Sequence, residues 1–152
     1  MNIPTLRSFL LVSWIAATLG AQGSQQPLGG GCANRTPPSV SGALAIGTPL
    51  QIDDPGCFTG QGGFGVMAFG APLAAHLPLT LNSSIRGFET CFVAVTPTVL
   101  ADVTSVRFPL LVPIPNVPAL RGVQVGLQTI CRECGFAGCF ELLTQGLGVT
   151  IG

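Results

Sequence analysis

Six cysteines are the most reactive residues of this chain, and disulfides, a metal site and redox catalysis compete to explain them. They are Cys32, Cys57, Cys91, Cys131, Cys134 and Cys139. Cys131 and Cys134 have the Cys-x-x-Cys spacing of half a zinc site or of a thiol oxidoreductase. The second half of a zinc site is missing, since Cys139 stands alone and His76 is distant in sequence. Gly135 follows Cys134 directly and no strand–helix–strand unit surrounds the pair, which disfavours redox catalysis.

The first 21 residues have the organisation of a secretory signal peptide. Arg7 precedes an apolar stretch over 9–17, and Gly20 and Ala21 offer small residues for cleavage. The stretch is shorter than the ~20 residues of a membrane-spanning helix. We therefore expect a protein that is secreted or held at the cell surface, with no transmembrane segment after cleavage. In that oxidising compartment an even number of cysteines favours three structural disulfides, although their spacing leaves the connectivity open.

The chain after residue 21 divides into a short leader and one domain. Residues 22–31 (QGSQQPLGGG) are rich in Gly and Gln, and we expect them to be a flexible leader. We expect residues 32–152 to form a single domain, because no linker or repeat interrupts them and the length suits one core.

The composition excludes several classes of protein. Only 8% of the residues are charged, the net charge is zero and there is no Lys, so the chain has no basic face for nucleic acid. The 47% hydrophobic content excludes a disordered chain. The 21 Gly and 13 Pro exclude a coiled coil. A loop-rich β domain remains.

Short apolar runs separated by Gly and Pro continue to the end of the chain, and they predict strands. The predicted strands cover residues 39–46, 50–52, 64–69, 77–81, 90–96, 105–112, 123–130, 140–142 and 147–151. Residues 97–103 could make a helical turn. This spacing predicts an all-β fold, an antiparallel β-sandwich of about eight short strands, jelly-roll or immunoglobulin-like and stapled by disulfides.

Three sequence blocks, taken in their order, carry a resemblance to a known family. They are Gly-x-Gly-Cys at 29–32, Pro-Ile-Pro-Asn-x-Pro-Ala-Leu-x-Gly at 113–122 and Gly-Leu-x-Val-Thr-Ile at 146–151. Together they resemble a family of small exported β-rich domains found in planctomycetes and related environmental bacteria. The resemblance spans residues 29–151 and implies a β-sandwich, with no established activity.

The resemblance also implies one disulfide, which falls here on Cys32 and Cys91. This chain departs from the family pattern by its four further cysteines and by Thr129, which stands where an aromatic residue is usual after Gln128. We expect the additional cysteines to staple Cys57 and the 131–139 segment locally.

One histidine and six carboxylates are the remaining candidates for catalysis. The carboxylates are Asp53, Asp54, Glu89, Asp102, Glu133 and Glu141. A hydrolase could use His76 as its base, but no Gly-x-Ser-x-Gly motif supplies a nucleophile. Asp53 and Asp54 are adjacent, so a strand would point them to opposite faces, unlike a glycosidase pair. In a turn over 53–56 they would cap their own backbone, with Ca²⁺ binding as the alternative.

Two further patterns imitate functional motifs. Residues 60–65 resemble a glycine-rich phosphate loop, but no helix follows and Lys is absent, so we expect a hairpin connection. The chain has no Tyr, and its one Trp lies at position 14 within the signal peptide. Sugar-stacking platforms are therefore scarce, and we expect most of the nine Phe to be buried.

These observations favour an exported, non-enzymatic structural or adhesive module that acts at the cell surface or outside the cell. Its partner would be a protein or extracellular matrix, held by apolar and backbone contacts because charge is scarce. A carbohydrate-binding module is the alternative, and a hydrolase based on His76 is the second alternative. We expect no catalytic residue, no cofactor and no metal site, and the sequence leaves the oligomeric state open.

Overall fold

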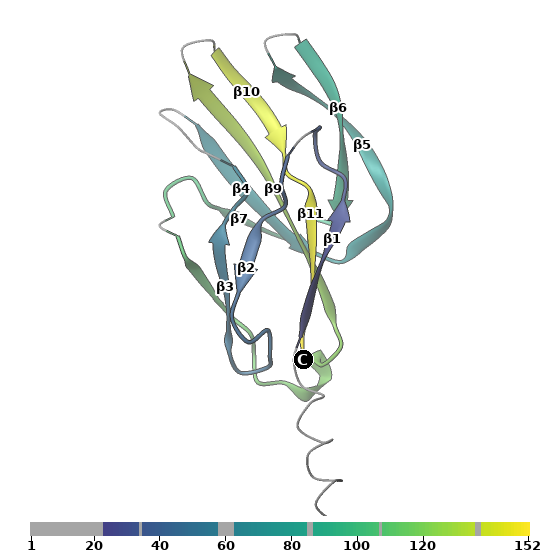
Figure 1. Ribbon diagram of the computed structural model, residues 1–152, viewed down its shortest axis with the longest axis vertical. Coiled ribbons are helices and arrows are strands. Elements are labelled where there is room, and N and C mark those ends of the chain that lie inside the picture. The colour runs from purple at the N-terminus through teal and green to yellow at the C-terminus, as the bar shows by residue number, and fades with distance from the viewer. Residues whose placement is uncertain (1–22, 34, 58–62, 85–86, 107, 136–137) are drawn as a thin grey trace, which may run out of the picture.

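The chain folds almost entirely into antiparallel β-strands (Figure 1). The computed structural model describes residues 23–33, 35–57, 63–84, 87–106, 108–135 and 138–152. Within these ranges there are eleven strands and one short 3₁₀ helix. Their bounds are β1 Ser24–Gly29, β2 Ser39–Ser41, β3 Pro49–Asp54, β4 Phe64–Gly70, β5 Pro72–Ser84, β6 Gly87–Val95, β7 Val99–Asp102, β8 Leu110–Pro113, η1 Pro118–Leu120, β9 Gln124–Gly135, β10 Gly138–Leu143 and β11 Gly146–Thr150.

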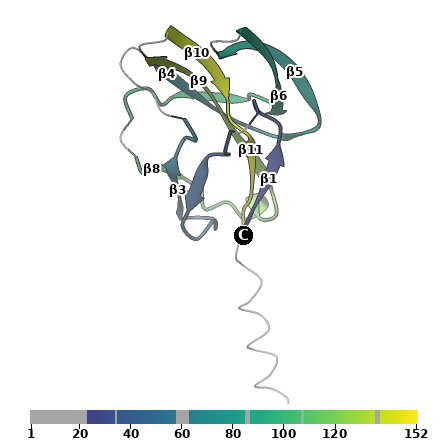
Figure 2. The same cartoon turned by 45° about the horizontal axis from the view of Figure 1, so that its top comes forward.

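A six-stranded sheet forms the centre of the molecule. Its strand order is β1-β11-β9-β4-β7, and β10 pairs with the far end of β9. A three-stranded sheet, β2-β3-β8, packs on one face of it, and the β5–β6 hairpin packs on the other. Figure 2 shows the β9–β10 and β5–β6 hairpins side by side at one end. The predicted all-β, disulfide-stapled sandwich is confirmed, with more strands than the eight or so expected.

The main core lies between the six-stranded and the three-stranded sheets. Alternation places Leu127 of β9 and Met67 of β4 on this face, and both side chains are fully buried. They meet Ile52 of β3, which is also fully buried. Successive side chains of a strand point to opposite faces, so the apolar residues that alternate in the sequence lie together on the core face of the sheet.

A second, smaller core lies under the β5–β6 hairpin. Leu81 of β5 and Cys91 of β6 pack there with Leu143 of β10. Close approach of the two layers needs glycine, because a Cβ atom on Gly126 of β9 would lie 2.7 Å from Cγ2 of Val95. The hairpin is thus fixed on the central sheet by a core of its own.

Gln128 joins the two layers by hydrogen bonds. Its side chain is only 2% exposed. The Ala94 N–H of β6 donates to Gln128 Oε1 (2.8 Å). Gln128 Nε2 donates to the carbonyl oxygens of Phe92 (3.1 Å) and Thr144 (2.8 Å). Every hydrogen-bonding group of this buried amide except one lone pair is therefore engaged, as burial of a polar side chain requires.

Strand β5 has a free edge, and Pro78 lies in the middle of it. The Phe92 N–H donates to the Gly31 carbonyl (3.0 Å), and the Gly31 N–H donates to the Phe92 carbonyl (2.7 Å). Because both backbone groups of Phe92 point away from β5, its register partner Pro78 also points its backbone away from β6. At this position the free edge of β5 therefore has no N–H donor, because the backbone nitrogen of Pro78 carries no hydrogen.

The start of the chain differs from the expectation. Instead of a flexible leader over 22–31, Ser24–Gly29 forms β1 and pairs with β11 along the edge of the six-stranded sheet. The polar sequence of β1 gives no alternation, and its order comes from the backbone hydrogen bonds of a partner more than a hundred residues away. The predicted signal peptide, residues 1–21, lies outside the described residues.

Three other local predictions are corrected. Of the strand expected over 39–46 only β2 forms, because Gly42 and Leu44 have positive φ values of 100° and 47° and turn the chain. Of the strand expected over 105–112, only the last part belongs to β8. The helical turn expected over 97–103 is instead the edge strand β7, whose pairing with β4 overrides local preference.

Thr129 and Thr144 are neighbouring buried threonines with different hydrogen bonding. Among the described residues, Thr129 Oγ1 is a buried atom that finds no partner, whereas Thr144 Oγ1 accepts the Thr129 N–H (2.9 Å). We expect Thr129→Val to raise the free energy of unfolding by about 1 kcal/mol, because a desolvated hydroxyl becomes a methyl of similar shape. Thr144→Val should instead lower it by about 1–3 kcal/mol, because the Thr129 N–H loses its acceptor. Urea denaturation midpoints measure both, and equal shifts would contradict the assignment.

None of the helical segments that the structure describes has the length and apolar character needed to cross a membrane.

Candidate functional site

All six cysteines are joined in disulfides, so none is free for metal binding or thiol catalysis. Cys32–Cys91, the pair that the resemblance implies, lies in the second core, and the Leu143 N–H donates to Cys32 Sγ (3.1 Å). Cys134–Cys139 joins register partners of the β9–β10 hairpin. Cys57–Cys131 connects residues 74 positions apart and ties the end of β3 to β9, which is a longer link than the local staple expected.

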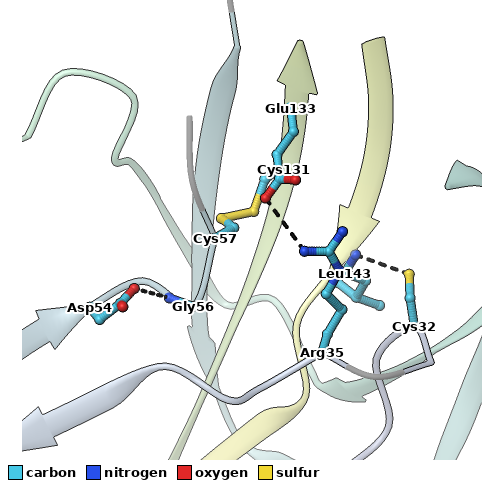
Figure 3. A network of polar contacts seen from close by, with 8 residues as sticks. All are labelled: Cys32, Arg35, Asp54, Gly56, Cys57, Cys131, Glu133 and Leu143. Carbon is cyan, nitrogen blue, oxygen red and sulfur yellow. Dashed lines mark hydrogen bonds and ion pairs between the residues drawn. A yellow bond between two sulfur atoms is a disulfide. The ribbon is translucent and has the colours of Figure 1, made fainter. Parts of the chain in front are cut away.

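A polar cavity of about 430 Å³ adjoins the Cys57–Cys131 disulfide. Figure 3 shows that Arg35 reaches towards Glu133 of β9, with Nη1 and Oε1 3.6 Å apart. On the other side of the disulfide, Asp54 Oδ1 accepts the Gly56 N–H (2.7 Å). The cavity therefore contains one guanidinium and two carboxylates that are already engaged with protein groups. Its lining includes no hydroxyl–histidine pair, so it has no activated nucleophile.

The two adjacent aspartates each accept a hydrogen bond from a residue close to them in sequence. Asp54 caps its own turn through the Gly56 N–H, as the sequence predicts for 53–56. Asp53 accepts a hydrogen bond from Gln51 Nε2 (2.6 Å), and hydrogen bonds from Gln51 and then Ser41 hold the pKa of Asp53 below its usual value. Among the described residues, no group of three His, Cys, Asp or Glu side chains is arranged to hold a metal ion.

Asp102 at the end of β7 also accepts a hydrogen bond from a nearby backbone N–H. The Thr104 N–H donates to Asp102 Oδ1 (2.8 Å), and the side-chain and then the backbone hydrogen bonds of Thr104 lower the pKa of Asp102. Glu89 accepts the Ala33 N–H on Oε1 (2.9 Å). Each of these two carboxylates accepts a backbone N–H, and neither lines the polar cavity.

His76 lies exposed on β5, beside the N-terminal strand. A Cβ atom on Gly29 of β1 would lie 3.4 Å from His76 Cε1, so the imidazole covers this glycine. His76 does not line either the polar cavity or the apolar cavity described below. Residues 60–62 of the glycine-rich segment 60–65 lie outside the described residues, so the structure does not test the expected hairpin connection there.

The outward face of the β5–β6 hairpin is an exposed surface without charge. We call it the hairpin face, and it consists of Pro78, Thr80 and Asn82 opposite Phe92, Thr90 and Phe88. Phe88 is 80% exposed and Phe92 42% exposed. They lie about 13 Å apart along β6, from the rise of a strand. The expectation that most Phe are buried is wrong: none of the six Phe that the structure describes is buried, and Phe64 is exposed as well as these two. Phe88 and Phe92 are exposed because the alternate residues of β6 supply the second core.

A half-enclosed apolar cavity of about 300 Å³ opens at the other end of the sandwich. Its lining comes from β3, β4, β8, η1, β9 and β11 and contains only apolar residues. Leu50, Val149 and Ile151 are buried and form its floor, while Pro113 and Pro115 are exposed at its rim. No sequence pattern indicated this cavity, since it is assembled from six separate segments.

Comparison with family models, with curated proteins and with solved structures finds no match for this chain.

Proposed function

We propose that this protein is an exported, non-enzymatic interaction module, structural or adhesive, that holds an uncharged protein surface at or outside the cell. The observation that carries the proposal is the hairpin face, where Phe88 and Phe92 are exposed on a hairpin fixed by its own core. Aromatic side chains held on rigid strands are the usual anchors of protein interfaces, because they bury large area at small entropic cost. The three disulfides support location in an oxidising compartment, where such bonds form and persist.

The absence of charge on the hairpin face favours an apolar or hydroxyl-bearing partner over a charged one. Its side chains are two phenyl rings, one proline, two threonines and one amide. The Thr80–Thr90 pair lies between the rings and offers hydroxyls for a few directed hydrogen bonds. A polysaccharide is the second candidate for the same surface, since the rings and hydroxyls alternate along one face of the hairpin.

Replacing both phenyl rings with serine, in a Phe88→Ser/Phe92→Ser variant, tests this function. We expect the amount of protein retained on the exporting cells, compared with that in the medium, to fall about tenfold or more, because loss of an aromatic anchor weakens an interface by at least that factor. The control is Val99→Ser/Leu100→Ser, which removes two exposed apolar side chains from β7, an edge strand of the six-stranded sheet and not of the hairpin. Equal retention of both variants and the wild type would contradict the proposal.

A competition arm separates the protein partner from the polysaccharide. Prior protease treatment of the cells should abolish retention, whereas soluble neutral polysaccharides should not compete. Displacement by a polysaccharide would favour the carbohydrate-binding alternative, and loss of binding with a chelator would add a Ca²⁺ requirement. The non-reduced intact mass of the exported protein tests export itself, because it gives the cleavage position and the two hydrogens lost for each disulfide.

A further inference from the structure

We propose that the apolar cavity at the η1 end of the sandwich binds the hydrocarbon chain of a small amphiphile. The cavity has about 300 Å³, which is the lower end of the range of small-molecule sites in proteins. It lies away from the hairpin face and shares no residue with it. The inference therefore stands independently of the interaction surface proposed above.

The lining gives a water molecule no polar partner. A buried water needs two to four polar partners, and apolar cavities without them stay dry and bind hydrocarbons. The backbone groups near the cavity are already paired: the Ile114 N–H donates to the Thr48 carbonyl (3.1 Å), and the Ile151 N–H donates to the Val123 carbonyl (3.0 Å). A ligand inside this cavity thus meets only carbon.

The rim excludes an added β-strand as the occupant. A strand would dock along β8, but Pro113 and Pro115 lack the N–H groups that such pairing uses, and Pro109 precedes the strand. The block 113–122, which the sequence made conspicuous, supplies both this rim and the η1 wall through Leu120. A flexible chain that enters end-on fits this opening better than an extended peptide that lies across it.

The volume sets the length of the chain. A methylene group occupies about as much space as a water molecule in the liquid, ~30 Å³. The cavity therefore accommodates at most about ten carbons, and the polar end of the amphiphile remains at the rim in contact with water. Nothing polar in the lining selects the headgroup, so the chain, not the headgroup, decides affinity.

The test uses the disulfide-bonded protein, the uncharged dye N-phenyl-1-naphthylamine, and linear 1-alkanols of increasing length as competitors. The dye should show saturable emission, and the alkanols should displace it with affinity rising about fourfold per methylene until about ten carbons, then levelling off. Absence of saturable emission, or competition that does not depend on chain length, would overturn the proposal.

Adjacent residues of β8 provide matched variants. Val112 lines the cavity, whereas Leu111 is 56% exposed on the opposite face of the strand. Val112→Phe should fill the cavity and weaken dye binding about tenfold or more, whereas Leu111→Phe should bind as the wild type does. Equal binding by all three proteins would overturn the proposal. If Val112→Phe does not fold, methyl NMR of the wild type decides: the alkanol must shift the methyl signals of Leu50, Val149 and Ile151, and shifts elsewhere would contradict the site.

Discussion

Replacing Cys32 and Cys91 together with alanine is expected to lower the free energy of unfolding by about 4 kcal/mol. The disulfide closes a loop of 59 residues, and the loss of chain entropy in the unfolded state grows with the length of such a loop. Both residues are buried in the second core, where Cys32 Sγ also accepts the Leu143 N–H, so the variant loses packing and a hydrogen bond as well. Since domains of this size are stable by only about 5–15 kcal/mol, much of the protein would unfold in mild denaturant.

The matched control is the Cys134→Ala/Cys139→Ala variant. This disulfide closes only five residues between register partners of a hairpin, so its removal should cost about 2 kcal/mol or less. Urea denaturation under non-reducing conditions measures both variants while the remaining disulfides stay formed. A larger effect at the hairpin than at Cys32–Cys91 would show that chain entropy does not dominate here.

Replacing Gln128 with leucine is expected to lower the free energy of unfolding by about 3–4 kcal/mol. The variant loses three hydrogen bonds that join β6, β9 and the β10–β11 connection, each of which contributes about 1 kcal/mol. It also leaves the buried Ala94 N–H without its acceptor, which adds a desolvation cost. The Phe92 carbonyl is affected less, because it also accepts the Gly31 N–H.

Gln124 offers the control for this change. It lies four residues earlier on the same face of β9, is half-buried, and its side chain makes no hydrogen bond within the described part of the chain. Gln124→Leu should alter stability by less than about 0.5 kcal/mol. Hydrogen exchange adds a local readout, because the Ala94 amide should lose protection in Gln128→Leu and keep it in Gln124→Leu. Similar effects of the two substitutions would assign the loss to side-chain volume.

The strands that sequence predicts well are those whose two faces lie in different surroundings. In β9, Leu127 enters the main core while Gln128 faces the hairpin, and the alternation is visible in the sequence. Strands β1 and β7 are edge strands with mostly exposed side chains, so their hydrogen bonds come from β11 and β4 and leave no local pattern. The premature end of β2 depends on Leu44 in a left-handed conformation, which tertiary contacts impose.

The candidate sites are less visible in the sequence than the fold. An even number of cysteines after a predicted signal peptide predicts disulfides, but only the folded chain brings Cys57 to Cys131 across 74 positions. Phe88 and Phe92 are exposed because the alternate residues of β6 face the second core. The sequence around them would be equally compatible with buried rings. The apolar cavity is assembled from six segments, and each of its residues is an ordinary core residue when taken alone.

Pro78 has a consequence for how copies of this domain coexist at high density. A thirteen-residue strand with one unpaired edge, in a protein with few charges, is a template on which cross-β fibrils can grow. A proline nitrogen at the middle of that template interrupts the continuous ladder that a neighbouring molecule would have to form. Molecules at high density can therefore remain separate, folded units without relying on electrostatic repulsion.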